Sequence, residues 1–159
     1  MDSIYKHLIT ASVFLFTASA LSVQDTDNSN LARINNFEVH EGQEYLQVFL
    51  ACHRKRPATE KDVYQLAKYY PPGQHKIVLK ATRSIDQIGV EQEAYLTSSV
   101  DFKQGHEYDI KGVFDKNNVD IQLVDKKTGT VEKLQTVELK PHHKIPSNQT
   151  FKLCRESTV

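Results

Sequence analysis

HEYDIKGVFDKNNVDIQLVDKKTGTVEKLQTVEL, residues 106–139, is the stretch that decides the fold. Apolar and polar residues alternate through three runs, which are His106–Asp115, Val119–Asp125 and Thr130–Leu139. A period of two is typical of strands, because successive side chains of a strand point to opposite faces of a sheet. Residues 116–118 and 126–129 are rich in turn formers and connect the runs as hairpins. The stretch therefore predicts an antiparallel three-strand meander.

Four further runs of this kind precede the meander. They are Asn36–His40, Glu44–Ala51, Lys76–Thr82 and Glu93–Phe102. Pro71-Pro72-Gly73 forms a turn before the third run, and Arg83–Gln92 is a long connection before the fourth. About seven strands, with turns about every 8 to 12 residues, are typical of a sandwich. We therefore predict a mainly-β fold, an antiparallel β-sandwich of about seven strands.

Residues 57–70 fit two local structures. Their apolar residues have helical spacing when counted from Val63 and strand spacing when counted from Tyr64. A short helix and an extended chain both stay open for this segment, so the predicted fold includes the option of one short helix.

The N-terminal residues are typical of an export leader. Lys6 and His7 precede an apolar run, Leu8–Ala20, which ends in the small residues Ala18-Ser19-Ala20. About 13 residues is the length of a signal-peptide core, whereas a helix that crosses a bilayer needs roughly 20. We expect the leader to be cleaved and the mature protein to be periplasmic or secreted.

The domain organisation follows from this leader. Residues 1–20 are predicted to be the signal peptide, and the polar residues 21–33 a flexible mature N-terminus. The remaining residues, 34–159, suffice for one domain with its own core and form the predicted β-sandwich.

The chain has two cysteines, Cys52 and Cys154. In an oxidising compartment an even number of cysteines favours a disulfide, which here would close a loop of about 100 residues and fix the C-terminal tail. Metal ligation with His53 or His142 is the alternative, but no pair has the close spacing that marks a zinc site. We predict the disulfide, no metal and no cofactor.

The charges are balanced, with 20 basic and 20 acidic residues. This balance argues against nucleic acid as a partner, and against a membrane except through a leader that is retained. The basic cluster His53–Arg56 is interpreted as a solvated connection.

Three motifs resemble those of a known group of proteins. They are Pro71–Ile77, Val100–Tyr108 and Val124–Gly129, within a region that spans roughly residues 64–139. Together they resemble small exported bacterial envelope proteins with an immunoglobulin-like β-sandwich, many of which are lipoproteins without an assigned role. The resemblance implies an envelope location and that fold, and it implies no catalytic residues. The chain departs from the lipoproteins because no cysteine follows its apolar run.

The sequence contains no catalytic constellation, so we expect no enzyme. Two histidines, His75 and His106, each follow a turn glycine at the start of a strand and could lie at one end of the sandwich. With Glu107 they give the alternative function, a small metal-binding or ligand-binding protein or a hydrolase.

The leading hypothesis is an exported non-catalytic protein, in the envelope or secreted, that acts as an interaction or structural accessory module. Its partner is expected to be a protein, bound through a sheet edge or through a tyrosine surface. That surface would be formed by Tyr64, Tyr69 and Tyr70, because exposed tyrosines are common in binding sites.

Overall fold

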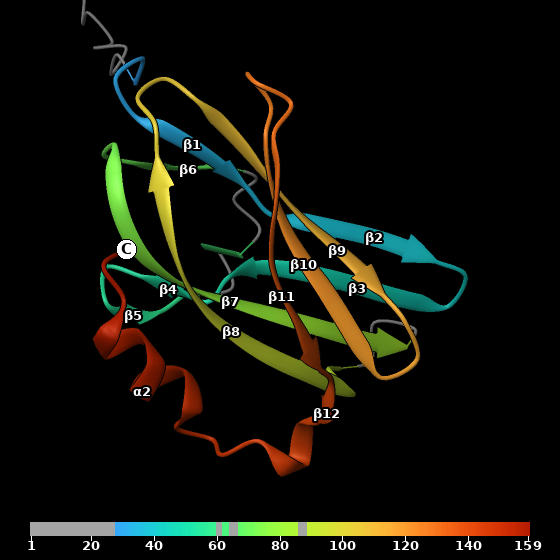
Figure 1. The fold of residues 1–159 in the computed structure, drawn as a ribbon. Coiled ribbons are helices and arrows are strands. Elements are labelled where there is room, and N and C mark those ends of the chain that lie inside the picture. The colour runs from blue at the N-terminus through green and yellow to red at the C-terminus, as the bar shows by residue number, and fades with distance from the viewer. Residues whose placement is uncertain (1–27, 60–61, 64–66, 86–88) are drawn as a thin grey trace, which may run out of the picture.

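The computed structural model describes residues 28–59, 62–63, 67–85 and 89–159. Most of the described chain lies in two five-stranded sheets and a short hairpin, and one helix, α2, lies below them in Figure 1.

The first sheet has the strand order β11-β10-β9-β1-β6. Its strands are β1 (Ala32–Asn35), β6 (Ala67–Tyr70), β9 (Glu107–Phe114), β10 (Asn118–Asp125) and β11 (Val131–Glu138). The predicted meander is confirmed as β9, β10 and β11. The interior strand β1 pairs antiparallel with β6 and parallel with β9, so the sheet is not purely antiparallel.

The second sheet has the order β12-β8-β7-β3-β2 and is antiparallel throughout. Its strands are β2 (Phe37–Glu41), β3 (Glu44–Leu50), β7 (Gly73–Ile85), β8 (Gln92–Phe102) and β12 (Lys140–Pro141). The strands β4 (Cys52–His53) and β5 (Arg56–Pro57) form a separate hairpin. A 3-10 turn, η1 (His142–Lys144), and the helix α2 (Gln149–Glu156) follow β12.

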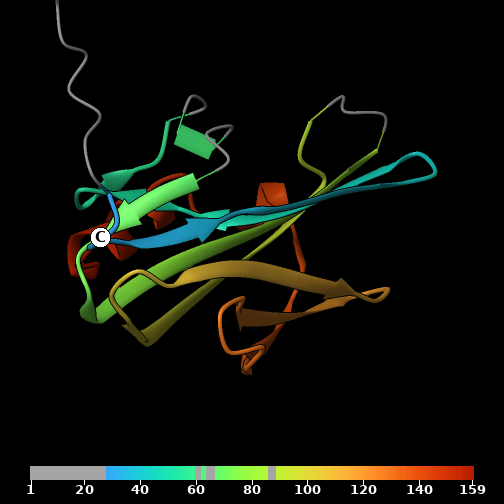
Figure 2. The same ribbon diagram turned by 90° about the horizontal axis from the view of Figure 1, so that it is seen from above.

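The two sheets face each other across one hydrophobic core (Figure 2). The first sheet contributes Ile34, Ile110 and Ile121 to it, and the second contributes Val48 and Leu79. All five side chains are buried, as the alternating pattern of their strands predicts. A smaller cluster lies on the outer face of the second sheet, where α2 covers it.

The described residues form twelve strands, so the prediction of about seven was wrong. The seven longer strands are those that the alternation predicted: β2, β3, β7, β8, β9, β10 and β11. The other five have two to four residues, which is too short for a periodic pattern.

Three boundaries also differ from the predictions. The strand β1 begins at Ala32, inside the segment expected to be a flexible N-terminus. The ambiguous segment ends as strand β6, and part of it, residues 60–61 and 64–66, lies outside the described residues. The long helix is the C-terminal α2, which the sequence did not predict because Cys154 is its one buried residue.

Gly112 of β9 packs closely against the second sheet. A Cβ at this position of β9 would lie 2.7 Å from Cγ2 of Val48 on β3 and 2.9 Å from Cε2 of Phe114. Because neighbouring side chains of a packed core must shift to admit a methyl group, we expect Gly112→Ala to lower the unfolding free energy by about 1–3 kcal/mol.

Urea unfolding followed by circular dichroism measures this change. The control is Val113→Thr at the next position, where the side chain is 61% exposed, and its effect should stay within about 0.5 kcal/mol. Equal stabilities of the two variants would contradict the packing described here.

Candidate functional site

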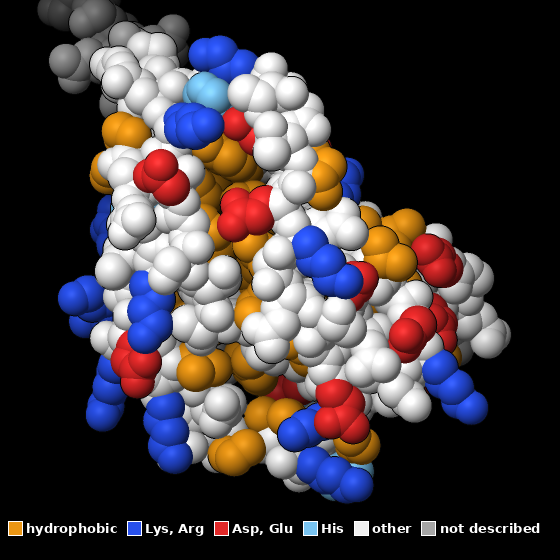
Figure 3. Space-filling model, in the orientation of Figure 1, with side chains coloured by type: hydrophobic (Ala, Val, Ile, Leu, Met, Phe, Trp, Pro, Cys, Tyr) orange, Lys and Arg blue, Asp and Glu red, His pale blue; other side chains and the backbone are white. Residues whose placement is uncertain are grey.

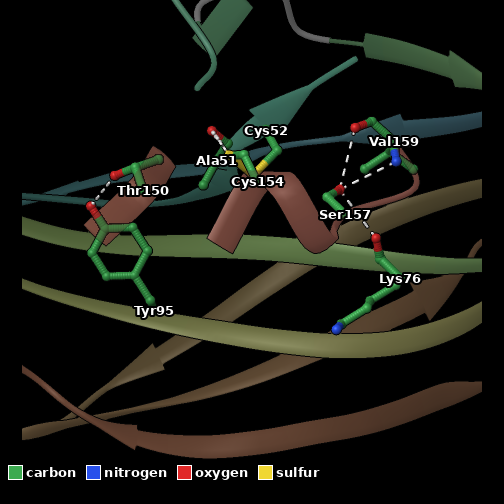
Figure 4. Close-up of a disulfide and its surroundings, with 8 residues drawn as sticks. All are labelled: Ala51, Cys52, Lys76, Tyr95, Thr150, Cys154, Ser157 and Val159. Atoms are coloured by element: carbon green, nitrogen blue, oxygen red, sulfur yellow. Dashed lines mark hydrogen bonds between the residues drawn. A yellow bond between two sulfur atoms is a disulfide. The ribbon is translucent and has the colours of Figure 1, made fainter. Parts of the chain in front are cut away.

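A disulfide joins Cys52 of β4 to Cys154 of α2, as predicted (Figure 4). The two Cα atoms are 5.4 Å apart, and the residues are separated by 102 positions in the chain. Both cysteines are buried and pack with Ala51 and Val78 beneath the helix. The bond therefore fixes α2 to the outer face of the second sheet.

The residues after α2 are also bound to this sheet. The Lys76 N–H donates to Thr158 Oγ1 at 2.8 Å, and the Thr158 N–H donates to Lys76 O at 2.9 Å. Ser157 Oγ donates to the same carbonyl (Figure 4). At the other end of α2, Tyr95 Oη and Thr150 Oγ1 lie 2.8 Å apart. The C-terminal segment is thus attached along the whole length of the helix.

A buried ion pair lies beside α2 and was missed in the sequence. Glu93 of β8 is 2% exposed, and its Oε2 lies 2.5 Å from Nζ of Lys80 on β7. The same oxygen lies 3.1 Å from His142 Nδ1, which comes from η1. Burial is the largest single influence on the pKa of Lys80, and it lowers this pKa. The hydrogen bonds to Glu93 and Tyr95 together outweigh burial, so the pKa lies above its usual value. Lys80 therefore stays charged beside Glu93, and the contact of Glu93 with His142 joins η1 to the sheet.

The two histidines of the alternative hypothesis lie at opposite ends of a row of aromatic rings. The centroid distances are 5.4 Å from His75 to Phe102, 5.3 Å from Phe102 to Tyr108 and 6.2 Å from Tyr108 to His106. His75 Nε2 donates to the carbonyl of Pro71 at 2.8 Å. The histidines are at the same end of the molecule, and two aromatic side chains separate them.

His106 and Glu107 have separate partners. His106 Nδ1 lies 2.8 Å from Oδ2 of Asp125, and Glu107 lies 2.8 Å from both Lys126 Nζ and Asn35 Nδ2. Within the part of the chain that the structure describes, no three His, Cys, Asp or Glu side chains gather in a way that could hold a metal ion.

The tyrosine surface is reduced by the register of β6. Tyr69 is 45% exposed, whereas Tyr70 points into the core, is 6% exposed and lies against Phe102. Adjacent residues of a strand face opposite sides, which explains the difference. Tyr64 lies outside the described residues. Of the two described tyrosines, only Tyr69 is available to a partner.

A cleft between β8 and the β10–β11 hairpin is the main hollow of the face shown in Figure 3. Hydrophobic side chains form its floor, and acidic side chains lie along its margin. One pocket of the cleft has a volume of about 340 Å³, with Val100, Tyr108 and Leu123 in its lining. A second pocket of about 430 Å³ lies further along the same strands, between Ala94–Tyr95 and Gln135–Glu138.

One wall of this cleft is an open strand edge. The partner of β8 on this side is β12, which pairs only with Gln92 and Glu93. From Ala94 to Phe102, no described strand pairs with this edge. The segment Ala94–Val100 contains no charged residue, and Asp101 follows it on the same open edge.

The register shows which backbone groups face the cleft. Val78 and Lys76 of β7 accept hydrogen bonds from the segments that follow β3 and α2, on the side away from β8. They lie opposite Thr97 and Ser99 of β8. Because both backbone groups of a residue in an antiparallel pair point to the same edge, the N–H and C=O groups of Thr97 and Ser99 face the open side.

The disulfide gives a stability prediction. Reduction, or the double substitution Cys52→Ser and Cys154→Ser, should lower the unfolding free energy by about 2–5 kcal/mol, because the loop it closes is long. Urea unfolding with and without a phosphine reductant measures this loss. The double variant should have the same unfolding free energy as the reduced protein, and the reductant should not change it. Coincident unfolding midpoints of the oxidised and reduced proteins would contradict the role given to this bond.

Asp125 gives a pH prediction. Burial is the largest single influence on the pKa of this carboxyl, and it raises this pKa. Hydrogen bonds from His106, Thr128 and Lys127 together outweigh burial and hold the pKa below its usual value. A lowered pKa contributes stability above the unfolded value, about 3.9, which is lost as the pH falls. We expect Asp125→Asn to cost about 1–3 kcal/mol at pH 7, because its bonds are charge-assisted.

The difference between wild type and Asp125→Asn should shrink as the pH is lowered through about 4, measured by urea unfolding over a pH series. Asp101→Asn is the matched control, because Asp101 is exposed and has no hydrogen-bond partner among the described residues. A difference that stays constant with pH would overturn this account.

Comparisons with known proteins add no relative. No protein-family model, no curated protein and no solved structure matches this chain. Of the helices in the described part of the chain, none has the length and hydropathy that a bilayer crossing requires. The fold is a mainly-β arrangement of two sheets, held at its C-terminus by a disulfide.

Proposed function

We propose that this chain is an exported, non-catalytic interaction module that binds an extended segment of a partner protein along the open edge of β8. The observation that carries this proposal is the unpaired, uncharged edge from Ala94 to Val100, which forms one wall of the cleft. Addition of a strand to such an edge is a common mode of peptide recognition.

An open edge of this kind is otherwise a liability. Unpaired strand edges favour aggregation, and proteins usually protect them with lysine, proline or a bulge. The other long edge strands carry such charges: β2 has Glu38 and Glu41, and β11 has Glu132 and Lys133. The open part of β8 has Thr97 and Ser99 on its outer face, and its one charge, Asp101, lies near the end of the strand. This contrast supports an edge that is kept available for a partner.

The cleft provides specificity in addition to backbone pairing. A strand added to β8 would direct alternate side chains toward the floor of the cleft, beside Val100, and the others toward solvent. The floor offers Leu123 and Tyr108 to the side chains that point inward. Backbone hydrogen bonds would then supply affinity, and the pockets would select side chains.

Export is supported by the disulfide, and the leader lies outside the described residues. The disulfide fits an oxidising compartment, where such bonds persist. The leader over residues 1–20 and the envelope location stay predictions, as does the immunoglobulin-like form of the fold, for which the resemblance of the three turn motifs is the support.

The proposal is tested with Thr97→Pro. Proline removes the Thr97 N–H, which would donate a hydrogen bond to a partner strand, and its ring blocks the approach of that strand. The hydrogen bonds between β8 and β7 come from other residues of β8. The probe is a displayed library of random linear peptides, from which binders of the wild-type protein are selected. We expect these binders to lose all measurable affinity for Thr97→Pro, while Thr97→Val, which keeps the N–H, retains it.

Amide hydrogen exchange supplies the second readout. The amides of Thr97 and Ser99 should exchange more slowly when a selected peptide is bound, and those of β2 should not change. Ser99→Pro repeats the test if Thr97→Pro fails to fold. Failure to select any binder, or binders that are indifferent to both proline variants, would overturn the proposal.

A further inference from the structure

The pocket of the cleft that Val100, Tyr108 and Leu123 line combines an apolar floor with an acidic rim. The floor contains Val100, Tyr108 and Leu123, which come from three different strands of the two sheets. The rim contains three carboxylates, Asp101, Asp125 and Glu132, and one cation, Lys103. The pocket therefore presents net negative charge above a hydrophobic surface.

The carboxylates differ in what they already bind. Asp125 is committed to the protein, because it accepts hydrogen bonds from His106 Nδ1 and from the amide of Lys127. Asp101 and Glu132 form no ion pair or hydrogen bond with any described residue. Two carboxylates without such partners thus line the pocket, one from β8 and one from β11.

Tyr108 reports how closely these charges converge. Its phenol is 5% exposed, and its oxygen accepts a hydrogen bond from the Lys103 N–H at 2.9 Å. Burial raises its pKa most strongly, the hydrogen bond lowers it, and the negative charges of Asp125, Asp101 and Glu132 all raise it further. The negative charge of the rim therefore reaches Tyr108 at the floor of the pocket.

We propose that this pocket is a specificity pocket for a lysine or arginine side chain, carried by the extended segment that pairs with β8. This inference rests on the proposed function and names the chemistry of the partner. The aliphatic stem of such a side chain would cover Val100 and Leu123, and its cationic head would reach Asp101 and Glu132. An extended segment that pairs with β8 would direct every second side chain to this side of the sheet.

Charge complementarity selects this occupant over others. A neutral apolar side chain would fill the floor but leave two carboxylates facing it without a counter-ion, and an acidic side chain would be repelled. Arginine and lysine alone combine a long apolar stem with a positive head. The pocket volume of about 340 Å³ admits one such side chain with its hydration water.

The test uses the peptides selected from the random library. We expect enrichment of lysine or arginine at one fixed position and of apolar residues two positions away. In a selected peptide with lysine, replacement of that lysine by norleucine removes the ammonium group and retains most of the stem. We expect this replacement to weaken binding by about tenfold or more, which corresponds to about 1.4 kcal/mol.

A double-mutant cycle locates the effect. Asp101→Asn combined with Glu132→Gln should weaken binding of the lysine peptide by a similar factor, and should leave binding of the norleucine peptide unchanged. Glu38→Gln combined with Glu41→Gln, on the distant edge strand β2, makes the same change of charge and should have no effect. A higher salt concentration should weaken binding of the lysine peptide more than binding of the norleucine peptide.

The outcomes separate this inference from the proposed function. Binders that are blocked by Thr97→Pro but show no preference for basic residues would overturn the specificity pocket and leave strand addition intact. Binders selected for acidic residues, or a lysine effect that the carboxylate variants do not change, would overturn it equally. If no peptide binds the edge at all, both proposals fail.

Discussion

The pairing of β7 with β8 is the interaction on which the rest of the structure depends. These are the longest strands, and they are paired from Gly73↔Phe102 to Arg83↔Gln92. Their inner faces supply Leu79 and Leu96 to the core between the sheets. Their outer faces supply Val78 and Tyr95 to the cluster beneath α2. One hairpin therefore supports two hydrophobic layers, which explains why Ile77, Val78 and Leu79 are apolar without interruption.

The sequence predicts those parts of this protein that depend on local periodicity. Seven longer strands and the disulfide were predicted, because alternation and an even cysteine count are local or compositional signals. The short strands and α2 were not, since two to four residues carry no period and α2 buries only Cys154. The cleft could not be predicted, because it depends on the order of strands, and nothing in residues 94–100 shows that β12 pairs with only two residues of β8.

The candidate site also shows why single residue types were poor guides. His75 and His106 attracted attention as chemical groups, yet each is held by a local partner, the carbonyl of Pro71 and the carboxylate of Asp125. The features that distinguish the cleft are an absence of charge along residues 94–100 of β8 and two carboxylates without counter-ions, Asp101 and Glu132. Their meaning depends on tertiary context, because a neutral strand is unremarkable inside a sheet and conspicuous at its edge.

The parallel pairing of β1 with β9 constrains the order in which the protein can fold. The strand β1 is an interior strand of the first sheet, and its neighbour β9 begins at Glu107. Asn35 of β1 donates a hydrogen bond to Asp109 of β9, which lies 74 residues further along the chain. Contacts this distant in the chain are slow to form, because a long loop must close before they contribute. During synthesis, which starts at the N-terminus, β1 is therefore made well before β9. It can pair with β6 but not with β9 until most of the chain has been synthesised. The first sheet closes late, and folding is completed only when synthesis is nearly over.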